Sequence, residues 1–395
     1  MKTDLQKEKF IKAFRDRSLG YYENTIEISN DFDYAEDIID IEQSMRWLIK
    51  HNIPLFSIKE NASGRKVLDS ENCWILDKIK PYLKYDHSYM ADGIVKSYFA
   101  GQIAKSFPMH IFNPYVELFF RYLNDKLMGQ IDLYNYLFNH YRDDELLKTV
   151  VDTLNDFISG IRNEGKSKPF KLILSDYQRL PQKNYKGLMD DTEKVFRHYE
   201  SFMAFRIDLS YKKEKLDPPL NENDRLQMYY QAIGDLELFL KNMGTNPQFK
   251  LMIYPAWKLE CGLQKGIHIQ CLFFFNRSQD KANINMPTLV GEYWNTLTEG
   301  KGLYHICDTY ETQYNQTGLN HMNYGDTALR VKLEEVASYL TKTDYYARMI
   351  APDNGPTFGK GEVKANNPVR PQDHIAKFIS LGDNRPFLVY KKSDN

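Results

Sequence analysis

The stretch that decides the fold of this chain is KGIHIQCLFFFN, residues 265–276. An apolar run follows a glycine, and His268 and Gln270 stand two residues apart within it. Residues two apart on a β-strand point to the same face of the sheet. We therefore expect a strand over 266–275 that projects an imidazole and an amide side by side from one face.

The preceding segment, 249–259, has the pattern of a second strand, and a short stretch containing glycine joins it to 266–275. So short a connection favours an antiparallel hairpin. The turn then brings Glu260 beside His268, so that a carboxylate, an imidazole and the amide oxygen of Gln270 converge. Ligands of this kind suit Mg²⁺ or Mn²⁺. The alternatives are a histidine held in the core and a carboxylate exposed in a turn.

Helical spacing over 328–346 places Tyr339 and Lys342 three residues apart and so adjacent on the helix surface. A phenol is a poor nucleophile at neutral pH. A nearby ammonium favours the phenolate, and a metal polarises the phosphate that it attacks. The alternative is an ordinary amphipathic helix. Tyr345 and Tyr346 follow on the same expected helix, as reserve nucleophiles or as packing residues.

The alternation over Phe205–Tyr211 predicts another strand, with Arg206 and Asp208 on its polar face. Further strands are expected over 170–175, 303–309 and 386–391, and helices over 190–201, 223–243 and 287–298. This order of elements indicates an α+β domain over residues 170–395, in which a central antiparallel sheet is covered by helices on one face.

The first 160 residues have a different pattern. Apolar residues at three- and four-residue spacing predict helices near 35–50, 92–106, 114–127 and 144–161, and hence a mostly helical domain over residues 1–160. Residues 161–169 are polar, contain a glycine and end in proline, so we expect a linker there.

The composition excludes several classes of protein. Four cysteines without a CxxC spacing argue against a disulfide scaffold or a zinc site and favour reduced thiols in a cytoplasm. The N-terminus lacks the apolar segment of a signal peptide, and no run of about 18 apolar residues occurs, so no membrane partner is expected. The net charge is −1, with 20 Lys and Arg against 25 Asp and Glu in residues 1–160 and 32 against 28 in residues 161–395.

In this order the three blocks resemble the three motifs of the HUH-type endonucleases, which initiate rolling-circle replication. Phe205–Tyr211 resembles the first motif, His268–Gln270 the metal motif in its His-hydrophobic-Gln form, and Tyr339–Lys342 the YxxK nucleophile motif. The wider string over 257–276 looks most like replication proteins of filamentous phages (inoviruses) and related prophages, in which a second histidine is usual at the position of Gln270. The resemblance covers about residues 200–350.

The resemblance implies a mechanism and a set of partners. Glu260, His268 and Gln270 would hold Mg²⁺ or Mn²⁺ against the scissile phosphate of single-stranded or extruded origin DNA. Tyr339 would attack phosphorus, with Lys342 beside it, and stay joined to the 5′ phosphate. The freed 3′ hydroxyl would serve a host polymerase, assisted by a helicase. The residues assigned to DNA contact are Arg206, Asp208, Tyr345 and Tyr346.

Two other functions fit the same residues. One is a DNA-binding regulator of a phage or plasmid that has this sheet but does not nick, an alternative favoured by Gln270 and by the near-neutral charge. The other is an RNA-binding α/β module. The position of Tyr339 separates nicking from these alternatives, because nicking requires that tyrosine on the same sheet face as Glu260 and His268.

Overall fold

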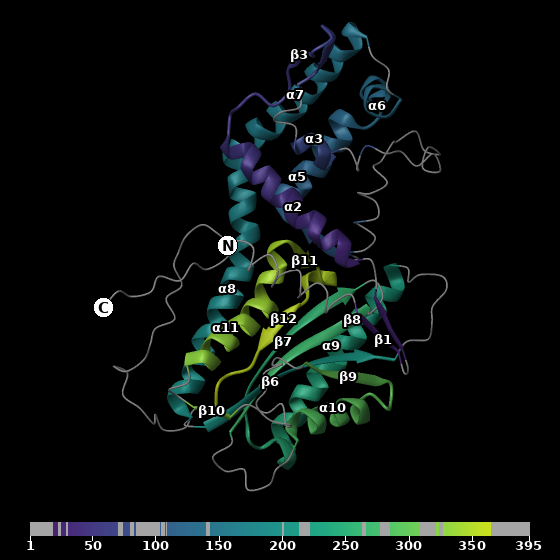
Figure 1. Ribbon diagram of the computed structural model, residues 1–395. Helices are drawn as coiled ribbons and strands as arrows, with labels where there is room; N and C mark the ends of the chain where they lie inside the picture. The colour runs from purple at the N-terminus through teal and green to yellow at the C-terminus, as the bar shows by residue number, and fades with distance from the viewer. Residues whose placement is uncertain are drawn as a thin grey trace, which may run out of the picture. The chain divides into compact units, whose positions relative to one another are not determined.

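The structure is a computed structural model, and it describes residues 19–22, 25–28, 31–69, 74–79, 83, 103, 107, 109–139, 143–199, 201–212, 222–262, 266–276, 285–307, 321–323 and 327–364. The chain forms two compact units. One is Asn30–Gln178, and the other joins Met1–Ser29 to Arg179–Asn395. Figure 1 shows the helices and strands of both units.

The unit Asn30–Gln178 is mostly helical in its described residues. Its helices are α2 (Asp31–Lys50), α3 (Trp74–Ile79), α5 (Pro114–Tyr122), the π-helical turn η3 (Leu123–Leu127), α6 (Ile131–Phe138), α7 (Asp144–Lys166) and the beginning of α8 (Lys168–His198). The short strands are β3 (Ile58–Glu60) and β4 (Lys66–Leu68), which pair antiparallel, and β5 (His110–Phe112). The apolar spacing seen in the sequence is the buried face of α7, from Leu147 to Ile161.

All of residues 161–169 except Ser167 are helical, so the prediction of a polar linker there is wrong. α7 continues to Lys166, and α8 begins at Lys168. Gly165 does not break α7, because its missing side chain is what allows close packing: a Cβ at this position would collide with Ile49. This polar stretch therefore continues as a helix, and its glycine makes room for a side chain of α2.

The predicted strand over 170–175 is also helical, because it belongs to α8. Pro169 stands in the first turn of that helix, where its missing N–H group costs nothing. Phe170 and Tyr177, seven residues apart and thus on one helix face, are buried. The boundary between the two units follows Gln178, inside α8 rather than in a loop.

The second unit is built on a sheet of six antiparallel strands. These are β6 (Ser201–Tyr211), β7 (Met252–Gly262), β8 (Gly266–Asn276), β9 (Gly302–Cys307), β10 (His321–Asn323) and β12 (Phe358–Lys360), in the order β10-β6-β8-β7-β12, with β9 also paired to β6. β8 lies between β6 and β7 and is buried over its whole length. Its continuous apolar run is typical of such a central strand.

The other elements of this unit follow, besides the part of α8 after Gln178. They are α9 (Glu222–Thr245), α10 (Met286–Leu297), α11 (Thr327–Lys342), the hairpin of β1 (Leu19–Tyr22) and β2 (Thr25–Ile28), the strand β11 (Ala347–Met349), and the short 3₁₀ turns η4 (Pro247–Phe249), η5 (Thr343–Tyr345) and η6 (Pro352–Asn354). The strands predicted over 203–211, 249–259 and 266–275 are confirmed, although the second begins at Met252, and so are the helices over 223–243 and 287–298. The strand predicted over 303–309 is confirmed as far as Cys307, where the described residues end. The strand predicted over 386–391 and most of the helix predicted over 92–106 lie outside the described residues.

Helices cover both faces of the sheet, so the prediction of a one-sided cover is wrong. On one face, Phe239 of α9 packs against Phe273 with ring centroids 6.4 Å apart, and Trp294 of α10 donates a hydrogen bond from Nε1 to the backbone oxygen of Ser210. Phe274, the next residue along β8, points the opposite way into a core made with α8 and α11. A central strand with apolar residues on both sides needs cover on both sides.

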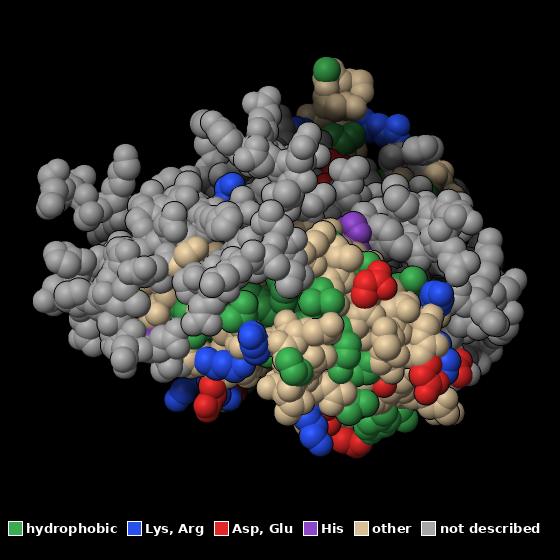
Figure 2. All heavy atoms as spheres, turned by 90° about the horizontal axis from the view of Figure 1, so that it is seen from below, with side chains coloured by type: hydrophobic (Ala, Val, Ile, Leu, Met, Phe, Trp, Pro, Cys, Tyr) green, Lys and Arg blue, Asp and Glu red, His purple; other side chains and the backbone are tan. Residues whose placement is uncertain are grey.

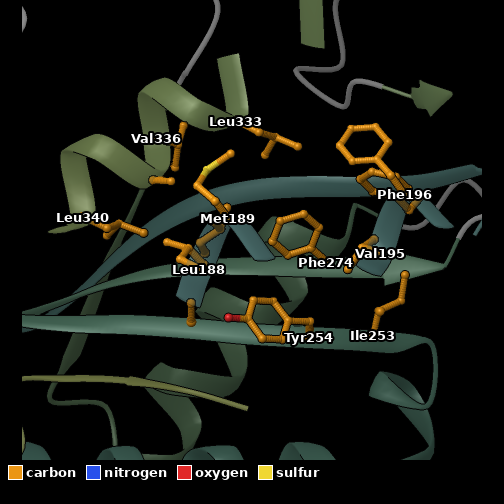
Figure 3. Packing of buried hydrophobic residues seen from close by; sticks show 14 of the residues in the cluster. Leu188, Met189, Val195, Phe196, Ile253, Tyr254, Phe274, Leu333, Val336 and Leu340 are labelled. Atoms are coloured by element: carbon orange, nitrogen blue, oxygen red, sulfur yellow. The ribbon is translucent and has the colours of Figure 1, made fainter. Parts of the chain in front are cut away.

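Figure 3 shows the packing on the α8 and α11 face. Leu333, Val336 and Leu340 of α11 point toward the sheet, where Tyr254 and Phe274 meet them. Leu188 and Met189 of α8 fill the space beside them. This core sets the position of α11 over the sheet, and with it the position of any functional side chain on α11.

Candidate functional site

The candidate site lies on the α8 and α11 face, where β7 and β8 approach their turn. Glu260 is paired directly with His268, and Lys258 is paired with Gln270. On the other side of β8, Asp208 of β6 is also paired with Gln270. Residues directly opposite each other in antiparallel strands point to one face with Cβ atoms about 5 Å apart. The predicted neighbourhood of Glu260, His268 and Gln270 is therefore present.

The His268 ring is fully buried and held in one orientation. Its Nδ1 lies 3.1 Å from the backbone oxygen of Gly266. A carbonyl oxygen only accepts, so Nδ1 carries the proton and the neutral ring has its lone pair on Nε2. Histidines that bind a metal through one ring nitrogen commonly donate the N–H of the other ring nitrogen in this way. Gly266 has a positive φ of 64°, a conformation that favours glycine.

A buried ion-pair cluster adjoins this pair. The ammonium of Lys258 lies 2.5 Å from Glu260 Oε1 and 2.6 Å from Asp344 Oδ1, and it also donates to Thr343 Oγ1. The Lys258 side chain is only 1% exposed. Neither Lys258 nor Asp344 was among the predicted site residues. The alternation of β7 could have identified Lys258, because it precedes Glu260 by two residues and so shares its face.

The protonation of the cluster follows from its geometry. Burial lowers the pKa of Lys258, but Asp344 and Glu260 outweigh burial and leave that pKa above its ordinary value. Burial raises the pKa of Asp344, and the Glu260 carboxylate acts in the same direction, against Lys258. The cluster thus contains one firmly charged ammonium between two carboxylates that compete for it.

Tyr339 reaches the same face from α11. Its hydroxyl accepts a hydrogen bond of 3.1 Å from Gln270 Nε2. The guanidinium of Arg206 covers its ring, with Cζ 4.1 Å from the ring centroid. The tyrosine is half-buried, whereas Arg206 is buried. The structure therefore brings Tyr339 together with Gln270, whose strand pair is the next one on the same sheet face after Glu260 and His268.

The four residues assigned to DNA contact are not on an open surface. Arg206, Asp208, Tyr345 and Tyr346 are all buried. The two tyrosines pack edge to face with ring centroids 5.0 Å apart, which agrees with the packing alternative. They also lie beyond the end of α11 rather than on it, because η5 begins at Thr343. The side chain of Lys342 lies outside the described residues.

The donor atoms bear on metal binding in two ways. Within the residues that the structure describes, no group of three or more His, Cys, Asp or Glu converges as a metal site. Glu260 and His268 supply two such side chains, and Gln270 adds an amide. All three side chains are of types that bind divalent cations. Lys258 is a competing cation, since its ammonium already binds Glu260.

The surface carries mixed charge where it can be seen. On the face shown in Figure 2, Lys and Arg side chains lie interspersed with Asp and Glu side chains among the described residues. The described residues of this face therefore do not form a uniformly positive surface of the kind that attracts a nucleic acid.

Comparison of the chain with protein-family models, with curated proteins and with solved structures finds no match. In the described part of the chain, no helix is both long and apolar enough to cross a bilayer.

Proposed function

We propose that this chain is a metal-dependent DNA nicking endonuclease of the rolling-circle initiator type, acting on single-stranded origin DNA in the cytoplasm. The observation that carries the proposal is the hydrogen bond between Gln270 and the Tyr339 hydroxyl. It joins the candidate nucleophile to the sheet face that also holds the Glu260–His268 pair. The resemblance of the three sequence blocks to the HUH motifs supports the same function.

The chemistry is a transfer of a phosphodiester to tyrosine. The Tyr339 oxygen attacks phosphorus, the bond from phosphorus to O3′ breaks, and the 5′ phosphate of the DNA becomes joined to the tyrosine. The phenol proton leaves to solvent, and the departing O3′ takes a proton from water to become a 3′ hydroxyl for a host polymerase. Gln270 orients the attacking oxygen by donating to it, and the Arg206 charge over the ring favours the phenolate.

The metal would be Mg²⁺ or Mn²⁺, held by Glu260, His268 and Gln270. When bound, such a cation stabilises the charge that develops on the phosphate oxygens. Lys342, three residues after Tyr339, would lie beside the phosphate or the phenolate. DNA would be held by charge and by stacking on aromatic side chains.

The test is covalent trapping on single-stranded DNA. The protein is incubated with Mn²⁺ and a pool of random-sequence oligonucleotides labelled at the 3′ end, so that label retained on the denatured protein reports a 5′ phosphotyrosine link. Wild type should retain label, and Tyr339→Phe should retain none. Tyr345→Phe and Tyr346→Phe are matched controls, because each removes one phenol hydroxyl nearby. Label that persists in Tyr339→Phe and disappears in a control would assign another nucleophile.

A DNA-binding regulator that does not nick is the second candidate. The buried contact of Lys258 with Glu260 favours it, since an ammonium already neutralises the carboxylate that a metal would need. This function predicts retarded migration of DNA with the wild-type protein but no label on the protein at any Mn²⁺ concentration.

A further inference from the structure

Lys258 connects the strand that carries Glu260 to the end of the helix that carries Tyr339. Glu260 belongs to β7, whereas Thr343 and Asp344 form the turn η5 directly after α11. The Lys258 ammonium contacts all three: 2.5 Å to Glu260, 2.6 Å to Asp344, and a hydrogen bond to the Thr343 hydroxyl. One side chain thus binds both elements on which the proposed reaction depends.

The Lys258 ammonium uses all of its donors and is shielded from water. An ammonium has three N–H donors, and the three oxygen partners account for all of them. The Lys258 side chain is 1% exposed, and the carboxylates of Glu260 and Asp344 are each 4% exposed, so water does not compete. A buried pair of this kind is strongly disrupted when one partner is removed, because the remaining charges are left uncompensated.

We propose that Lys258 is a positioning residue for the nucleophile: it holds the end of α11 at the distance from β7 that keeps the Tyr339 hydroxyl on Gln270. This inference rests on the proposed nicking function. Tyr339 precedes Thr343 by four residues, about one helical turn, so a displacement of the turn moves Tyr339 as well. A shift of about 1 Å in a reacting group lowers a rate on the order of 100-fold.

The test compares Lys258→Met with Lys360→Met. Methionine removes the charge and all three donors of Lys258 while keeping an unbranched side chain. Lys360 is the matched control, because its ammonium joins β12 to α8, through Asp191 and the backbone oxygen of Gly187, and not to the turn after α11. The readouts are the single-turnover rate of adduct formation with 3′-labelled DNA and Mn²⁺, DNA affinity by fluorescence anisotropy, and hydrogen exchange of amides 339–345.

Lys258→Met should slow adduct formation on the order of 100-fold, with DNA affinity unchanged and faster exchange at residues 339–345. Lys258→Arg should recover part of the rate, since it keeps the charge and the donors. Lys360→Met should change neither the rate nor that exchange. If Lys258→Met does not fold, the double variant with Asp344→Asn, which removes one of the two carboxylates left without the ammonium, should fold and still react slowly.

Two results would overturn the inference in distinguishable ways. A folded Lys258→Met protein that forms the adduct at the wild-type rate rejects the role of Lys258 and leaves the nicking function intact. A wild-type protein that forms no adduct rejects the nicking function, and the role of Lys258 falls with it.

Discussion

Replacing Arg206 with glutamine should slow the attachment of Tyr339 to DNA without weakening the hold on DNA. The Arg206 guanidinium is buried and lies 4.1 Å from the centre of the Tyr339 ring. A desolvated contact between a cation and an aromatic face contributes about 2 kcal/mol. Because about 1.4 kcal/mol of barrier is a factor of ten in rate, the expected loss is about 30-fold. The contact acts on the rate because the ring gains negative charge as the proton leaves.

The assay measures rate and affinity separately. Single-turnover adduct formation at saturating DNA gives the rate, and anisotropy titrations over a range of salt concentrations give the affinity and its salt dependence. A side chain that neutralises one phosphate of a single strand contributes about 0.7 to the slope of log affinity against log salt. A buried Arg206 contacts the tyrosine instead of a phosphate, so Arg206→Gln should leave that slope unchanged.

Arg330→Gln is the matched control for this variant. Arg330 is equally buried, lies 4.0 Å from the ring centre of Phe196, and forms an ion pair of 2.7 Å with Glu193. Its loss should lower the melting temperature without changing the adduct rate of the folded protein. An Arg206→Gln protein that reacts at the wild-type rate would refute this role of Arg206. A smaller salt slope in that variant would instead assign Arg206 to DNA contact.

Three other substitutions test separate features of the molecule. Glu42→Gln should raise the melting temperature at neutral pH. Burial raises the pKa of Glu42 more than Arg46 lowers it, so this pKa lies above 4.5 in the folded protein. Ionisation of Glu42 therefore opposes folding as the pH rises. Below about pH 4 the gain should vanish, and a gain that persists there contradicts the cause. His268→Ala should abolish the Mn²⁺-dependent adduct while circular dichroism stays native; an unchanged adduct removes His268 from the site. Gly291→Ala should cost about 1–3 kcal/mol in urea unfolding, because its Cβ would collide with the Tyr304 ring; no loss would show that the ring moves aside.

Local patterns predicted the sheet well and the connections poorly. Alternation and the apolar run identified β6, β7 and β8, because a strand's side chains alternate with a period of two whatever surrounds them. The polar, glycine-containing segment 161–169 predicted a linker, yet Gly165 lies inside α7 because Ile49 needs the space. The sequence contains the glycine but not the neighbour that requires it.

The sequence by itself determined the hairpin register that sets Glu260 opposite His268, since a short turn leaves few ways to pair two adjacent strands. Only the tertiary structure decided that Gln270 meets Tyr339, 69 residues away, and that Lys258 meets Thr343, 85 residues away. Those contacts depend on how α11 packs on the sheet. This packing is set by the fit of buried side chains from several elements. The periodicity within one segment does not encode such a fit.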